Sequence, residues 1–156
     1  MRHVFLALLL VAAAETAALA CTCIAVPTDA GERRSLAQDV AQDAVALVEV
    51  ELVTPFDAAT GRGERLRVVS TLAGQAPAAF DVERDRAPSS AACDLEFRSG
   101  ERVLVLLYPA RQPGQGAAAR FRLADSCLTH LLADLPFRNA LITAVGAAAG
   151  PARGSP

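Results

Sequence analysis

The sequence predicts a mainly β domain with short helices near its two ends. Two observations support this. Several stretches alternate apolar and polar residues, as strands with one buried face do, and the four cysteines suit two disulfide bridges. The 156 residues are enough for one domain. We expect that domain over 21–146, between a leader, 1–20, and an Ala-, Gly- and Pro-rich tail, 147–156, that we expect to be disordered.

Five segments are predicted to be strands. Four of them alternate apolar and polar residues, and the fourth in chain order is a continuous apolar run that we expect to be buried on both faces. Loops containing Gly or Pro separate most of them. The five segments are 48–52, 65–68, 80–83, 102–108 and 120–123. Five antiparallel strands in a small domain suggest a closed or partly open barrel such as the OB-fold, and the pattern also permits a sandwich.

Two helices are predicted to flank the strands. A Ser-x-x-Gln capping box that starts at Ser35, with apolar residues at helical spacing after it, predicts a short helix near 35–42. Pro136 stands where the first turn of a helix tolerates proline, and apolar residues follow it at helical spacing up to Gly146.

The first twenty residues have the pattern of a secretory signal peptide. A short basic start precedes the apolar run 4–14, and Ala18 and Ala20 supply the small residues before a cleavage point. Glu15 ends the run well short of a membrane span. Cleavage would make Cys21 the mature N-terminus of a secreted or periplasmic protein. The alternative is a lipid-modified Cys21, but that signal usually has Leu where Ala18 stands.

The charges argue against nucleic-acid binding. The formal net charge is −2, and the basic residues of the mature part are all Arg, scattered singly rather than gathered in a stripe. We therefore expect a monomer with no nucleic-acid partner and no membrane span.

The four cysteines all lie after the leader, at Cys21, Cys23, Cys93 and Cys127. A bridge between Cys21 and Cys23 would close a strained ring, so each should reach a distant partner, which leaves two pairings open. Residues i and i+2 of an extended segment point to the same side, so both can face the domain. If reduced, the C-x-C pair could instead hold a soft metal such as Cu(I) or act as a redox pair.

Five sequence features, taken in order, resemble one family. They are the C-T-C start at 21–23, STLAGQAP at 70–77, SSAAC at 89–93, GERVLV at 100–105 and the late Cys127. Together they look like the inhibitory domain of the tissue inhibitors of metalloproteinases, whose fold is the netrin-like OB-fold. The resemblance implies bridges from Cys21 to Cys93 and from Cys23 to Cys127, and it implies inhibition of a zinc endopeptidase.

The implied inhibition follows from zinc chemistry. A catalytic zinc keeps one coordination position open for water, and a blocker must occupy it. The amine and the carbonyl oxygen of Cys21 would chelate the zinc of the target enzyme, and Thr22 would enter the adjacent specificity pocket. Cys23 would anchor this segment at the edge of the pocket, and Ala91, Ala92 and Cys93 would lie alongside. An α-amino group with a pKa of about 7.7–8.0 is partly neutral at physiological pH and can donate to the metal.

Other functions have less support in the sequence. His130 is the one histidine of the mature chain, so no zinc or catalytic set can be assembled around it. Asp94 and Glu96 share one face of an extended stretch, and we expect them, like Asp125, to be solvated. We therefore expect no enzyme activity and no cofactor. The remaining alternative is a secreted or lipid-anchored OB-fold binding module that inhibits nothing.

Overall fold

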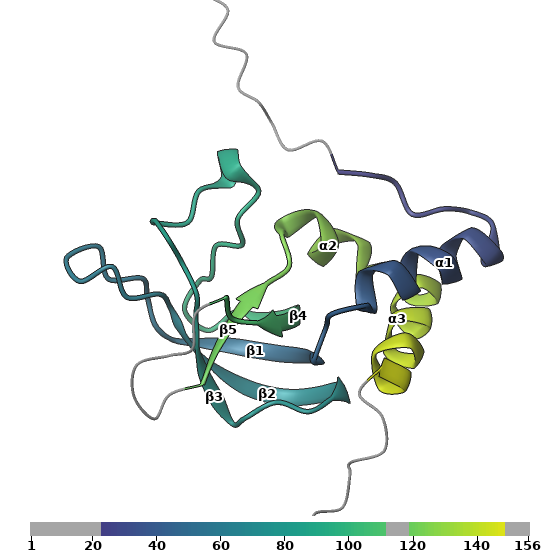
Figure 1. Cartoon of the computed structure of the whole chain (residues 1–156). Helices are drawn as coiled ribbons and strands as arrows, with labels where there is room; N and C mark the ends of the chain where they lie inside the picture. The colour runs from purple at the N-terminus through teal and green to yellow at the C-terminus, as the bar shows by residue number, and fades with distance from the viewer. Residues whose placement is uncertain (1–22, 112–118, 149–156) are drawn as a thin grey trace, which may run out of the picture.

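The protein is a five-stranded barrel with helices on one side (Figure 1). The structure, a computed structural model, describes residues 23–111 and 119–148, so the predicted leader and most of the predicted tail lie outside it. The closed barrel has the order β1-β2-β3-β5-β4. Its strands are β1 (Ala46–Thr54), β2 (Arg65–Gly74), β3 (Ala79–Val82), β4 (Arg102–Pro109) and β5 (Arg120–Leu123). All five predicted strands are confirmed, and the sandwich alternative is wrong.

Strand β1 holds the barrel together because it pairs along its length with both β2 and β4. The neighbouring strands are antiparallel with one exception: β3 and β5 run parallel, with Asp81 opposite Arg120 and Val82 opposite Phe121. The expectation of a wholly antiparallel sheet is wrong at this seam. Closure through the seam leaves no unpaired strand edge among these five strands.

The barrel interior is filled by side chains from all five strands. Phe80 is fully buried and meets Phe121 edge to face, with 5.3 Å between the ring centroids. The other buried members of this cluster are Ala46, Val48, Val50, Leu66, Val82, Leu95, Val105 and Leu107. Alternate residues of β1 and β4 point into this interior, as the period of a strand requires.

A second apolar cluster joins the barrel to two helices, α1 (Ala30–Ala41) and α3 (Leu135–Ala148). Leu47 of β1 and Leu106 of β4 point outward and are fully buried against Phe137 and Leu141 of α3. The central residues of β4 are therefore buried on both faces, as predicted. The predicted C-terminal helix is also confirmed, and it continues two residues beyond Gly146.

The start of α1 differs from the prediction. Asp29 is the N-cap, and its Oδ1 accepts hydrogen bonds from the backbone N–H groups of Gly31 (2.8 Å) and Glu32 (2.9 Å). These bonds, with Glu32 the larger cause, lower the pKa of the Asp29 carboxyl. The capping box at Ser35 is wrong, because Ser35 lies exposed inside the helix.

A short helix, α2 (Ser126–Leu131), was not predicted. Asp125 is its N-cap and accepts a hydrogen bond from the N–H of Leu128 at 3.0 Å. Asp125 is exposed, as expected, but its capping role was not predicted. Leu128 and Leu131 are buried against the barrel and the other helices, which fixes the helix in place.

Candidate functional site

The N-terminal segment is tied to α2 by a disulfide between Cys23 and Cys127, with 5.1 Å between the Cα atoms. This pairing is the one that the family resemblance implies, and the other long-range pairing of Cys23 is excluded. None of the described cysteines is a free thiol, so Cys23 cannot act as a metal-binding or redox-active thiolate here. The bridge holds the start of the described chain at the N-terminal end of α2.

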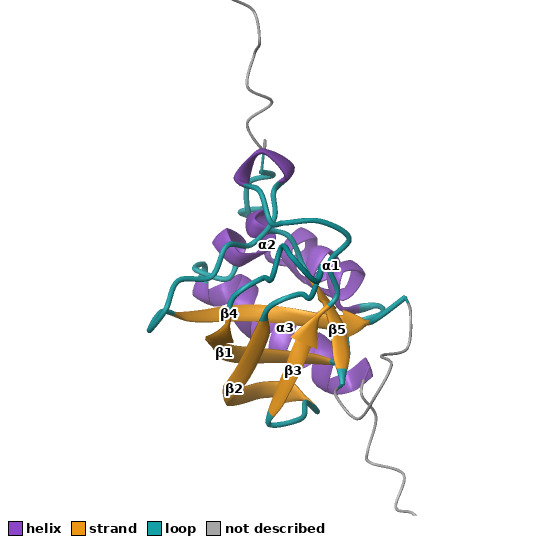
Figure 2. Cartoon of the chain, turned by 90° about the vertical axis from the view of Figure 1, so that its left-hand side faces the viewer, coloured by secondary structure: helices purple, strands orange, loops and turns teal. Residues whose placement is uncertain are grey.

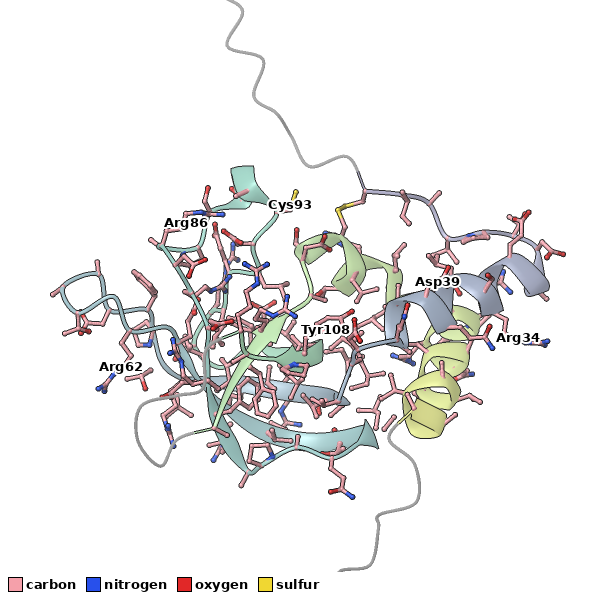
Figure 3. All side chains as sticks on the ribbon, in the orientation of Figure 1. Arg34, Asp39, Arg62, Arg86, Cys93 and Tyr108 are labelled. Carbon is pink, nitrogen blue, oxygen red and sulfur yellow. A yellow bond between two sulfur atoms is a disulfide. The ribbon has the colours of Figure 1, made fainter. Side chains whose placement is uncertain are left out.

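Cys93 lies beside this bridge. It follows η1 (Ser90–Ala92), a single 3-10 turn, and its backbone carbonyl accepts a hydrogen bond from the N–H of Ser126 at 2.9 Å. Ser126 precedes Cys127 in the chain, so two sequence-predicted site cysteines are brought together. Figure 3 shows the Cys93 sulfur at the same end of the molecule as the Cys23–Cys127 bridge.

The backbone of Cys93 is unusual. Its φ of 59° and ψ of 20° are left-handed, and it is the one non-glycine residue with positive φ among the described residues. A side chain in this conformation costs about 1 kcal/mol, so the surrounding contacts must hold it. The predicted partner, Cys21, lies outside the described residues, and the Cys21–Cys93 pairing stays a prediction.

Two carboxylates hold the loop that carries η1. Asp94 Oδ2 accepts from the Arg86 guanidinium at 2.6 Å and from the N–H of Ser89 at 3.2 Å. Glu96 Oε1 accepts from the N–H of Ser90 at 2.9 Å. Glu96 is exposed, as expected, whereas Asp94 is half-buried, and each also binds a backbone N–H at the start of the 3-10 turn. The loop extends beyond the end of the barrel (Figure 2).

The other predicted contact residues are only partly described. Ala92 is exposed at the end of η1, as a contact residue should be, and Ala91 lies in the same turn. Thr22 and Cys21 lie outside the described residues. Cys23 is exposed, and so is the next residue, Ile24, whose side chain is 61 % accessible.

An apolar hollow of about 270 Å³ adjoins the bridge. It is lined by Ile24, Val40, Tyr108, Ala124, Asp125, Cys127, Leu128 and Leu131. The Tyr108 hydroxyl donates a hydrogen bond to the carbonyl of Val40 at 2.9 Å. Burial, together with the nearby Asp125 charge, raises the pKa of Tyr108. This hydrogen bond joins β4 of the barrel to α1 at the wall of the hollow.

No metal-binding cluster is found in the described parts of the chain. His130 is exposed in the last turn of α2. Within 23–111 and 119–148, no group of three or more His, Cys, Asp and Glu side chains could hold a metal ion. None of the helices in these ranges is both long and apolar enough to span a bilayer.

Sequence reasoning missed one pair, Glu64 and Arg84, whose carboxylate and guanidinium form two hydrogen bonds of 3.0 and 3.1 Å. Nothing local could have revealed it, because Glu64 ends a Gly-containing loop and twenty residues separate the two. No family model, curated protein or solved structure matches this chain. Its own residues and geometry therefore define the candidate site.

Proposed function

We propose that the chain is a secreted or periplasmic inhibitor of zinc metalloendopeptidases, similar to the inhibitory domain of the tissue inhibitors of metalloproteinases. The observation that carries the proposal is the convergence of the C-x-C segment and the η1 loop. Cys23 is bonded to Cys127, and the carbonyl of Cys93 is hydrogen-bonded to the neighbouring Ser126. An inhibitor of this kind needs both segments on one rigid edge.

The barrel is consistent with a netrin-like OB-fold. A five-stranded barrel in which a long first strand pairs with both the second and the fourth is the arrangement expected of that fold. Because an OB-fold supports many functions, the proposal depends on the edge beside Cys127 and not on the barrel.

In the proposed mechanism, the mature N-terminus enters the active site of the peptidase. The Cys21 amine and carbonyl oxygen take the zinc position that water would hold, and the nucleophile is thereby expelled. Thr22 fills the adjacent specificity pocket, while Cys23, Ala91 and Ala92 contact the rim. A terminus held by disulfides loses little conformational entropy on binding, so more of the contact energy appears as affinity.

The test is to add one alanine before Cys21 in the mature protein. The addition leaves the bridges and the core in place but turns the chelating amine into an amide nitrogen, a poor metal donor. We expect normal folding and loss of most inhibition across a panel of zinc endopeptidases. An alanine added after Pro156 is the matched control and should inhibit like the unextended protein.

Two results would contradict the mechanism. If the N-terminally extended protein inhibits as well as the unextended one, the amine is not the ligand. If neither inhibits any peptidase of the panel, the binding-module alternative remains. The mass of the mature N-terminal peptide tests a prerequisite: a lipid on the Cys21 sulfur would prevent its disulfide, and an acyl group on its amine would prevent zinc chelation.

A further inference from the structure

The Arg84–Glu64 pair is the most buried ion pair among the described residues. The side chains are 10 % and 4 % accessible, and Glu64 is the one buried charged residue in this part of the chain. Both oxygens of the carboxylate accept from the guanidinium, in the two-point geometry that makes such pairs strong and directional. Burying two charges is costly, so a specific role for this pair is worth seeking.

The carboxylate end of the pair is fixed to the barrel. Glu64 directly precedes β2, and its carbonyl accepts a hydrogen bond from the N–H of Val82 in β3 at 2.8 Å. The preceding residue, Gly63, approaches the same strand so closely that a Cβ there would lie 1.9 Å from the Val82 carbonyl oxygen. The backbone therefore allows little movement of Glu64 relative to the barrel.

The guanidinium end reaches the loop that carries Cys93. Arg84 Nη2 donates to the carbonyl of Leu95 at 2.7 Å, and Nη1 lies 3.6 Å from Asp94 Oδ1. Asp94 in turn binds the N–H of Ser89 at the start of η1. Arg84 thus connects the barrel, through Glu64, to both ends of the segment 89–95.

We propose that Arg84 is a positioning residue, which holds the η1 loop so that Ala92 and Cys93 stand beside the Cys23–Cys127 bridge. Here the inference rests on the proposed function, since the positioned surface is the one that would contact the peptidase. Arg84 itself is too buried to be part of that surface. Arg84 affects binding indirectly, by holding Asp94 and Leu95 in place. The planar guanidinium is required, because a lysine ammonium cannot bind both Glu64 and Leu95 in the same geometry.

The test replaces both partners, Arg84→Met with Glu64→Leu. Removing Arg84 alone would leave a buried carboxylate without its partner and could unfold the protein, whereas apolar residues of similar volume in place of both are commonly neutral or stabilising. The control is the exposed pair on the barrel wall, Arg67→Met with Glu51→Leu, whose hydrogen bond is 2.9 Å long.

Three quantities are measured on the mature protein and both variants. They are the urea midpoint of unfolding, hydrogen exchange of the Asp94 and Ser126 amides, and the inhibition constant against a zinc endopeptidase. In the Arg84/Glu64 variant we expect a cooperative urea transition, with a midpoint lowered by no more than the lost hydrogen bond to the Leu95 carbonyl explains, exchange of both amides faster by about tenfold or more, and inhibition weaker by about tenfold or more. The control variant should match the wild type in exchange and inhibition.

Each other outcome has a definite meaning. Unchanged exchange overturns the proposal, because the loop would then not depend on Arg84. Faster exchange with unchanged inhibition also overturns it, because the loop would move without affecting binding. If the wild type inhibits nothing, the proposed function fails instead, and exchange alone decides whether Arg84 positions the loop.

Discussion

Removing the Cys23–Cys127 bridge, with Cys23→Ala and Cys127→Ala together, should destabilise the fold strongly. The two cysteines are 104 residues apart in sequence. The chain-entropy relation gives about 4.7 kcal/mol of stabilisation for a loop of this length, and about 4 kcal/mol when the proposed Cys21–Cys93 bridge is present, because that bridge shortens the loop closed by Cys23–Cys127. Cys23 is exposed, so the loss of packing at its own side chain adds little. Since single domains have about 5–15 kcal/mol of stability, the variant should be close to marginal.

The assay is urea and thermal unfolding of the mature protein and the double variant. For a domain of this size, about 4 °C of melting temperature is lost per kcal/mol, so we expect a melting temperature lower by roughly 15 °C. The m-value should rise, because an unfolded chain without the cross-link exposes more surface. The reduced wild type, measured in the same buffer, shows how much further stability the remaining cysteines supply.

A loss below about 1 kcal/mol would refute this reasoning. It would mean that the N-terminal segment is held to α2 by its other contacts and that the unfolded chain gains little freedom without the bridge. An unchanged m-value would point the same way, since it reports that the compactness of the unfolded state has not changed.

Three further predictions address the core, a titration and the target contact. Phe80→Ala removes a fully buried ring that packs on Phe121, and should lower the free energy of unfolding by about 3–5 kcal/mol in urea titrations. Tyr108 is the only tyrosine of the chain, so ultraviolet absorbance follows it alone. Because the pKa of Tyr108 is raised, the midpoint of its absorbance titration should lie above the usual value of about 10. The contribution of this pKa shift to the free energy of unfolding should be complete below about pH 10, and it should be lost as the pH rises through the pKa of the folded state. Thr22→Gly should weaken inhibition of a sensitive peptidase while leaving the melting temperature almost unchanged; a fall comparable to loss of a bridge would mark Thr22 as a core residue.

The strands were predictable because their pattern depends on which face is buried. Alternation in segments such as 65–68 and 80–83 follows directly from one face lining the barrel. The continuous apolar run of β4 also has a simple cause, since Leu106 faces the helices while Val105 and Leu107 face the interior. Burial on two sides requires apolar residues at consecutive positions.

The features that sequence reasoning missed depend on choices between competing local signals or on distant contacts. The helix begins earlier than the expected cap at Ser35, because the Asp29 carboxylate binds the backbone N–H groups of Gly31 and Glu32. The six residues of α2 are too few for a periodic pattern to be distinctive. The parallel pairing of β3 with β5 follows from closure of the barrel, which no local segment encodes.

The candidate site was predicted in its residue types but not in its geometry. The cysteine positions left two pairings open, and the family resemblance implied the Cys23–Cys127 bridge, which is confirmed. The left-handed backbone of Cys93 could not be predicted, because the sequence there has neither Gly nor Asn to mark it. The backbone hydrogen bonds of Asp94 and Glu96 could not be predicted either, because the sequence does not distinguish a carboxylate that binds backbone N–H groups from any other surface carboxylate.

The barrel interior is held by apolar packing, whereas most of the loop that carries η1 is held by charged side chains, and this difference affects how the surface can vary. The barrel interior is apolar and closed, and from the loop that carries η1 it receives Leu95, which is buried in it, and Phe97, which packs against it. The rest of the loop is held by Arg84, Arg86 and the carboxylates that they bind. Exposed positions such as Ala92 can therefore change without disturbing the core, whereas a change at Arg84 moves the whole loop. We expect substitutions at the exposed positions to change binding specificity most readily, and substitutions at buried positions such as Arg84 to change the shape of the edge.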